Sequence, residues 1–350
     1  MDTSPDPGTA ATAVDESALL EVRDLHVTFS TAGDPVHAVN GVSFELRRGE
    51  ILALVGESGS GKTVSSMSIA GLLPDNAAIR GEVLLDGENI LGAPESVLRG
   101  VRRDKVSYVF QDPVSSLNPA RRIGSQLEEL LRTNRGLSRA AARQRATDLL
   151  GHVGIPGPRR QLRAYPHELS GGMCQRVMLA LALASEPEII VADEATSALD
   201  VSIQAQILQL IQDVRAEFGM AMILVTHDFG VVAGIADRVA VMYGGEIVET
   251  GATDTILNEP LHPYTAALML SAPDAVSEDA DLFMIPGTLE EGREHAGKRC
   301  QFAPRCPFAF ERCWSEPPKL AARVRGHAAA CHLEGDEVAN WRGELTGSPR

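Results

Sequence analysis

The amino-acid sequence predicts an α/β fold with a mainly parallel core sheet. Two continuous aliphatic runs, Ile51–Val55 and Ala221–Thr226, have the length and composition of strands that are buried on both faces. Helical patterns alternate with such runs along the chain, which is typical of strand–helix–strand units. In addition, a glycine-rich loop, Gly56–Thr63, directly follows the first run and leads into a helix expected from Lys62 to Ala70.

The N-terminal part predicts a tail and then an antiparallel edge subdomain. Residues 1–18 are rich in Asp, Thr, Ala and Pro and lack the basic start and apolar block of a signal peptide, so we expect a disordered tail. Leu19–Phe29 and Val36–Leu46 alternate apolar and polar residues, as half-buried strands do. A loop with Gly, Asp and Pro joins these two strands, which favours antiparallel pairing.

The remaining elements divide the chain into a large domain and a C-terminal segment. Helical patterns run from Ile123 to Leu150 and from Cys174 to Ala184, which predicts a helical insertion over about residues 113–180. Further elements are expected as strands at Gly81–Leu85, Lys105–Phe110 and Glu188–Ala192 and as a helix at Ser202–Glu217. The composition changes near residue 258, so we place one domain at residues 19–258 and a loop-rich one at residues 259–350.

Composition limits the classes of function. The 350 residues carry a net charge of −15 and only 4% aromatic residues, which argues against a nucleic-acid-binding surface. No apolar stretch has the length needed to span a bilayer. We therefore expect the chain to stay in the cytoplasm and to act at a membrane only through a partner.

The glycine-rich loop has the spacing of a phosphate-binding loop, and a buried strand and a helix flank it as such a loop requires. Backbone N–H groups and the helix N-terminus would surround the phosphates of ATP. Lys62 would reach the β- and γ-phosphates, and Thr63 would bind Mg²⁺. The phosphate-binding residues are expected to be Gly56, Ser58, Gly59, Ser60, Gly61, Lys62 and Thr63.

Further polar residues follow strands at the same edge of the sheet. Asp193 would bind Mg²⁺, and the adjacent Glu194 would act as the general base for the attacking water. Gln111 would contact Mg²⁺ or that water, and His227 would donate a hydrogen bond to the γ-phosphate. Phe29 would stack on adenine; the alternative is a core aromatic residue.

Leu169–Met173 (Leu-Ser-Gly-Gly-Met) resembles the signature sequence of ABC transporter ATPase domains. The resemblance covers roughly residues 19–260 and implies that two ATPase subunits close on ATP. Ser170, Gly171 and Gly172 would then contact the nucleotide of the partner subunit. Asp200 matches the loop that lines the dimer interface in that family.

Four further segments make the chain similar to the ATP-binding subunits of dipeptide, oligopeptide and nickel importers, and Met173 in place of the commoner Gln resembles their D-type member. The segments are Phe110–Pro113, Ser116–Pro119, Tyr165–Leu169 and His262–Thr265. The resemblance implies an F-type ATPase as heterodimer partner, two transmembrane permease subunits and, indirectly, a substrate-binding protein. It places the chain peripherally on the cytoplasmic face of the cell membrane, with dipeptides or oligopeptides as cargo.

Other functions stay open. The cargo could be another small solute such as nickel or glutathione. A soluble ABC ATPase without a transporter is a second candidate, although the chain has one set of nucleotide motifs and no long coiled-coil insertion. A regulatory iron–sulfur module with a vestigial ATPase is a third, against which the intact motif residues argue.

Four of the five cysteines gather near the C-terminus: Cys300, Cys306, Cys313 and Cys331. In a reducing compartment such a group suggests metal ligation before disulfides. Four thiolates suit either a [4Fe–4S] cluster or zinc, and free thiols are the third possibility. The importer resemblance favours the [4Fe–4S] cluster. His327 and His332 are spare ligand candidates for such a metal site, but we interpret them as plain surface residues.

Overall fold

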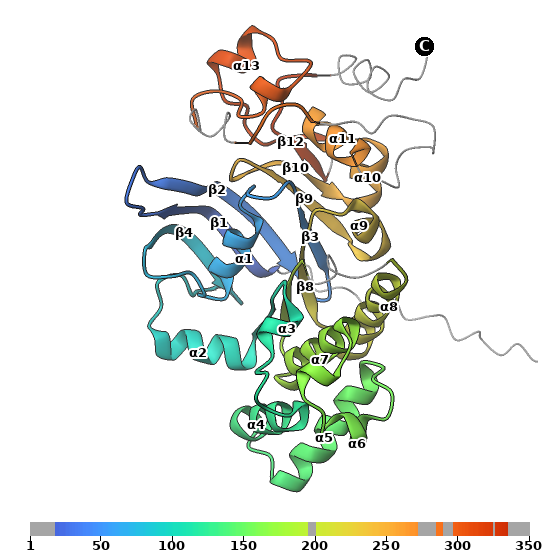
Figure 1. The fold of residues 1–350 in the computed structure, drawn as a ribbon. Coiled ribbons are helices and arrows are strands. Elements are labelled where there is room, and N and C mark those ends of the chain that lie inside the picture. The colour runs from blue at the N-terminus through green and yellow to red at the C-terminus, as the bar shows by residue number, and fades with distance from the viewer. Residues whose placement is uncertain (1–17, 195–200, 272–284, 290–296, 325, 335–350) are drawn as a thin grey trace, which may run out of the picture.

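The computed structural model describes residues 18–194, 201–271, 285–289, 297–324 and 326–334. A large mixed sheet forms the centre of the molecule, and a smaller antiparallel sheet and a helical arm lie beside it (Figure 1). The predicted α/β class with a mainly parallel core is confirmed.

Five parallel strands form the core of the large sheet, in the order β9-β3-β8-β7-β6. The central strand β3 (Ile51–Val55) lies between β8 (Ala221–Thr226) and β9 (Arg238–Tyr243), and all its residues are buried. The other two are β7 (Ile189–Asp193) and β6 (Val106–Val109). Because all five run in one direction, the residues that follow β3, β6, β7 and β8 reach one edge of the sheet.

The smaller sheet has the strand order β2-β1-β4-β5 and is antiparallel throughout, as predicted for the edge subdomain. Its strands are β1 (Ala18–Phe29), β2 (Val36–Arg47), β4 (Ala77–Leu85) and β5 (Glu88–Asn89). Helix α1 (Lys62–Ile69) packs between this sheet and the core, and α2 (Glu95–Asp104) precedes β6.

The expected helical insertion forms an arm at the opposite end of the molecule from the C-terminal segment (Figure 1). Leu127, Leu131, Ala146 and Leu149 pack together with α7 in one buried cluster. Helix α7 begins at Gly171, three residues before the predicted start, because the Ser170 hydroxyl accepts a bond from Met173 N and caps it. The arm comprises α3 (Pro113–Ser116), α4 (Ile123–Arg135), α5 (Arg139–His152), α6 (Pro158–Gln161), η1 (Pro166–Glu168) and α7 (Gly171–Ala184).

The C-terminal segment extends the large sheet. Strand β10 (Glu246–Ala252) pairs with β9 and also with β12 (His327–Ala329), which pairs with β11 (Ala321–Val324). The remaining helices are α8 (Val201–Phe218), α9 (Phe229–Ile235), α10 (Thr253–Asn258), α11 (Pro263–Leu270), η3 (Ala303–Arg305) and α13 (Glu311–Ser315).

One sequence interpretation is wrong in this segment. His327 is 2% exposed rather than on the surface, and its Nε2 lies 2.7 Å from Oε1 of the fully buried Glu249. The same carboxylate accepts hydrogen bonds from the backbone N–H groups of Leu261 and His262. Glu249 therefore joins β10, β12 and the start of α11.

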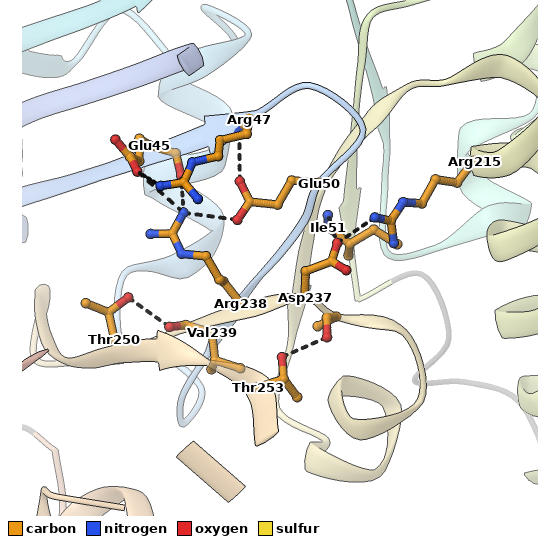
Figure 2. Close-up of polar contacts among 11 residues, drawn as sticks. Glu45, Arg47, Glu50, Ile51, Arg215, Asp237, Arg238, Val239, Thr250 and Thr253 are labelled. Carbon is orange, nitrogen blue, oxygen red and sulfur yellow. Dashed lines mark hydrogen bonds and ion pairs between the residues drawn. The ribbon is translucent and has the colours of Figure 1, made fainter. Parts of the chain in front are cut away.

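Two carboxylates fix the start of the central strand (Figure 2). The buried Glu50 accepts bonds from Arg47 N (2.7 Å) and Arg238 Nη1 (3.0 Å). Asp237 accepts from Ile51 N (2.7 Å) and pairs with Arg215 (2.8 Å). These contacts hold β3 in register with β9, and the register decides where the loop after β3 emerges.

Within the described residues, no helix is both long and apolar enough to cross a membrane.

Candidate nucleotide site

The loop after β3 has a backbone shape that requires glycine. Gly61 has φ 103°, and a Cβ there would lie 2.7 Å from the carbonyl oxygen of Ala38. A Cβ on Gly56 would lie 2.2 Å from the carbonyl oxygen of Met242. Side chains at either position would therefore push the loop away from β2 and β9. The loop curls tightly and delivers the chain directly into α1.

Lys62 is the buried cation of this loop. Its side chain is 4% exposed, and its Nζ donates to the carbonyl oxygens of Gly56 (2.7 Å) and Glu57 (2.9 Å). Burial lowers the pKa of Lys62, while the nearby carboxylates of Glu194 and Asp193 raise it. The ammonium is thus held at the loop, where a phosphate would be its natural counterion.

Asp193, the last residue of β7, meets Thr63 at the start of α1. The Thr63 hydroxyl donates to Asp193 Oδ1 (3.1 Å), and the Tyr108 hydroxyl donates to Oδ2 (3.0 Å). Burial raises the pKa of Asp193, and these two hydrogen bonds oppose the rise. One buried carboxylate and one hydroxyl supply the protein ligands that a Mg²⁺ site needs, because Mg²⁺ takes its other ligands from phosphates and water.

Glu194 follows Asp193 and has φ 46°, a left-handed conformation that costs a non-glycine residue about 1–3 kcal/mol. Its N–H donates to Val225 O (2.9 Å), which ties the turn to β8. Gln111 Nε2 donates to Glu194 Oε2 (2.6 Å), and His227 Nδ1 lies 3.3 Å from Oε1. The three predicted catalytic residues, Gln111, Glu194 and His227, follow three different strands, and the side chains of Gln111 and His227 meet at the Glu194 carboxylate.

A cavity of about 320 Å³ opens between the loop and these residues. Phe29 lies on its wall with Val36 and Ala38, so one side of the cavity is apolar. Its other lining residues are Ser58, Gly59, Ser60, Gly61, Lys62, Thr63, Val64, Gln111 and Glu194. The structure therefore brings the predicted phosphate, adenine and base residues to one space.

The signature residues lie apart from this cavity. Ser170 caps α7 and is exposed, with Gly171 and Gly172 in the first turn, and none of the three is among the residues that line the cavity. Asp200 falls outside the described residues.

The four C-terminal cysteines lie near one another and form no disulfide. Cys300 N donates to Cys313 O (3.0 Å), and charge on each of Cys313 and Cys331 would raise the pKa of Cys300. Burial is the main cause that raises the pKa values of Cys300 and Cys306 to about 12 and that of Cys331 to about 11. Across the described ranges, no three His, Cys, Asp or Glu side chains are arranged to hold a metal ion.

The sequence prediction missed two contributors. Tyr108 lies two residues before the end of its predicted strand, and only its register beside β7 brings its hydroxyl to Asp193. Arg305, between two of the cysteines, pairs with Glu57 of the phosphate-binding loop. Nothing local in the sequence signals that second contact, because 248 residues separate its partners.

Comparisons with known proteins agree with this geometry. The family described as "ABC transporter" matches residues 39–197, and "Oligopeptide/dipeptide transporter, C-terminal region" matches residues 248–313. The oligopeptide transport ATP-binding protein OppD of Salmonella typhimurium is 45% identical over 322 residues, which are 92% of this chain and 96% of that protein. The dipeptide transport ATP-binding protein DppD of Escherichia coli is 41% identical, over 92% of this chain and 98% of its own.

Solved structures give the same answer for the fold. A dimeric ATP-binding cassette in a post-hydrolysis state with ADP and phosphate has a TM-score of 0.61 and 30% identity, over 67% of this chain and 98% of its own. A subunit of a Clostridium perfringens ABC transporter complex has a TM-score of 0.61 and 28% identity, over 70% and 92%. This chain belongs to the ATP-hydrolysing ATP-binding proteins of ABC transporters, in the branch that carries the oligopeptide/dipeptide transporter C-terminal region.

Proposed function

We propose that this protein is the motor subunit of an ABC importer and couples ATP binding and hydrolysis to the uptake of dipeptides or oligopeptides. The observation that supports an active motor is the convergence of Lys62, Thr63 and Glu194 on one cavity, with Asp193 hydrogen-bonded to Thr63. The peptide cargo is supported by the names of the relatives. Nickel, glutathione or another small solute is the alternative cargo.

Each side chain has a distinct part in hydrolysis. Lys62 and the loop N–H groups bind the phosphates, and Thr63 and Asp193 hold Mg²⁺, which neutralises charge on the phosphates when bound. Glu194 accepts a proton from the attacking water. Gln111, a candidate Mg²⁺ or water contact, and His227, a candidate γ-phosphate donor, orient Glu194. Phe29 stacks on the adenine ring.

A second ATPase subunit completes the site. Ser170 and Gly171 are exposed at the N-terminus of α7 and Gly172 is buried in its first turn, where the dipole of the helix favours a phosphate of the partner's nucleotide. Asp200 would line the interface. An F-type ATPase is the proposed partner, so that the working motor is a heterodimer.

The membrane subunits dock in a groove between the helical arm and the core. The groove has a volume of about 320 Å³ and is lined mainly by apolar residues, among them Phe110 directly after β6, Leu130 of α4 and Met178 of α7. Phe110 is 43% exposed, so its ring adds to the apolar surface of the groove. The coupling helix of one permease subunit would cover it, which places the chain peripherally on the cytoplasmic face of the membrane.

The four cysteines, in a C-terminal domain at residues 259–350, are proposed to hold a [4Fe–4S] cluster, with zinc as the alternative. Four neighbouring thiols without disulfides supply the right number and kind of donor. In the described arrangement they do not meet at one point, so loading would have to draw them together. The test is iron, sulfide and zinc analysis after anaerobic purification of the wild type and Cys306→Ser. The buried, distant Cys174→Ser is the matched control.

Affinity purification of the tagged chain from detergent-solubilised native membranes tests the motor function. Two multi-span subunits and a second ATPase in the eluate, with ATPase activity that a peptide-loaded binding protein stimulates, are the expected result. An active ATPase that purifies without membrane proteins would favour a non-transport role and overturn the proposal.

A further inference from the structure

The C-terminal segment holds the phosphate-binding loop through Glu57. Arg305 of η3 is 4% exposed, and its guanidinium donates two hydrogen bonds to the Glu57 carboxylate, at 2.7 Å to Oε2 and 3.0 Å to Oε1. Such a paired geometry fixes both the distance and the orientation of the two groups. Glu57 lies between Gly56 and Ser58, inside the loop that is proposed to bind phosphate.

Arg305 is itself held rigidly. Its Nε donates to Pro286 O (2.7 Å), and its guanidinium lies over the ring of Tyr243, with 5.8 Å from Cζ to the ring centroid. The Tyr243, Tyr264 and Phe302 rings pack edge to face beneath it. The guanidinium therefore has little freedom to follow Glu57 if the loop moves.

The backbone of Glu57 is held as well. Its N–H donates to the hydroxyl of Tyr264 in α11 (2.8 Å), and its carbonyl oxygen accepts from Lys62 Nζ (2.9 Å). Tyr264 is fully buried. Glu57 thus pairs with Arg305 through its side chain and accepts the hydrogen bond of the Lys62 ammonium through its backbone carbonyl.

A second contact reaches the loop from the same side. Gly244 and Gly245 form the turn between β9 and β10, and Gly245 N donates to Ser60 O (2.9 Å). Gln301 of the cysteine segment covers this turn so closely that a Cβ on Gly244 would lie 2.1 Å from Gln301 Oε1. Arg305, next to Cys306, therefore contacts the loop directly, and Gln301, next to Cys300, contacts it through the turn of Gly244 and Gly245.

We infer that Arg305 is a positioning residue for ATP binding, which fixes the phosphate-binding loop through Glu57 and makes the affinity for ATP depend on the C-terminal cysteine segment. This inference rests on the proposed ATPase function. Arg305 touches neither the cavity nor the reacting atoms, so its effect is on the shape of the loop before ATP arrives. Binding costs less when the loop is already ordered.

A double-mutant cycle on the full-length chain tests the inference. Arg305→Met and Glu57→Gln should each raise the Kd for Mg·ATP about tenfold, because the loss of a hydrogen bond to a charged group changes an equilibrium constant by about that factor. The double variant should bind no more weakly than the weaker single variant, because both changes remove one interaction. At saturating ATP the kcat should stay within about twofold of the wild type, so that the loss is in KM.

Conservative and control variants separate positioning from damage to the fold. Arg305→Lys should recover part of the affinity, because Lys keeps the charge without the paired geometry. Tyr264→Phe removes only the bond to Glu57 N and should also weaken ATP binding. Arg312→Met, an exposed arginine of the same segment that pairs with Glu316, should bind ATP as the wild type does.

Three results would overturn the inference: wild-type affinity in Arg305→Met, additive losses in the double variant, or a fall in kcat with KM unchanged. If Arg305→Met does not fold, a cycle of Arg305→Lys with Glu57→Gln supplies the same comparison. A wild-type chain that binds no ATP would refute the proposed function instead.

Discussion

Tyr108 donates a hydrogen bond to Asp193 from the neighbouring parallel strand, with 3.0 Å between the phenol oxygen and Oδ2. Its hydroxyl also lies 2.9 Å from Ser66 Oγ in α1, while its ring lines the apolar groove beside Phe110. One side chain thus touches both the proposed magnesium carboxylate and the proposed docking groove for the permease.

Tyr108→Phe should raise the Mg²⁺ concentration needed for half-maximal ATPase activity by about tenfold, because loss of a bond that orients a metal ligand commonly has that effect. The pKa of Asp193 should rise further without this donor. Mg²⁺ titration of the ATPase rate measures the change. Tyr165→Phe, which alters a partly exposed tyrosine of the helical arm, is the control, and an identical Mg²⁺ requirement in Tyr108→Phe would contradict the role.

Glu194→Gln should keep ATP binding and lose nearly all turnover, since the base is removed while the phosphate loop remains. A loss of at least about 100-fold in kcat is expected from the contribution of a general base. Equilibrium binding of a fluorescent ATP analogue and phosphate release measure the two quantities. Glu217→Gln on α8 is the surface control, and near-normal turnover in Glu194→Gln would remove Glu194 from this role.

Lys62→Ala should weaken ATP binding by about tenfold or more, because it removes the buried cation that pairs with the phosphates. Calorimetry with Mg·ATP measures the change, and AMP serves as a comparison ligand without β- and γ-phosphates. The exposed Lys319→Ala should bind normally. Unchanged ATP affinity in Lys62→Ala would contradict the assignment.

His262 should make the protein less stable as the pH falls. Burial lowers its pKa from 6.5 to about 4, although Glu249 opposes the shift; His327 also bonds that carboxylate. The unfolded chain therefore binds a proton that the folded chain excludes, and stability present above pH 6.5 is lost as the pH approaches 4. The free energy of unfolding should fall by roughly 3 kcal/mol, at about 1.4 kcal/mol for each unit by which the pKa is lowered.

Urea unfolding at pH 7.5 and pH 5 measures this loss. In His262→Asn, which keeps a cap acceptor for α11, the drop in stability between the two pH values should be smaller than in the wild type. His152→Asn on the surface of α5 should leave the drop unchanged. An equal drop in the wild type and His262→Asn would show that other groups cause it.

The core could be predicted because its signals are local. The run Ile51–Val55 predicts a buried strand, and the glycines directly after it predict the loop and the start of the following helix. The spacing of the motifs then places Asp193 and Glu194 at the same edge of the sheet. Their individual roles remain predictions. Asp200 lies outside the described residues.

The missed features depend on contacts between distant residues. Tyr108 reaches Asp193 only through the pairing of β6 with β7, and a tyrosine in a short strand predicts no such bond. His327 is buried because Glu249, 78 residues earlier, accepts its hydrogen bond. The strands β11 and β12 have only four and three residues and are rich in alanine, so no alternating pattern announces them.

The pairing of β12 with β10 has a consequence for how this protein can be divided. Glu249 and Thr250 form the register with Ala329 and Ala328, so a chain cut after α10 would expose the backbone of the seven-residue β10 as a free sheet edge. A free edge of that length is a template for pairing with other chains. The truncated ATPase would thus be prone to self-association. The C-terminal segment therefore belongs structurally to the ATPase sheet, because it covers the edge of that sheet and cannot be removed without exposing it.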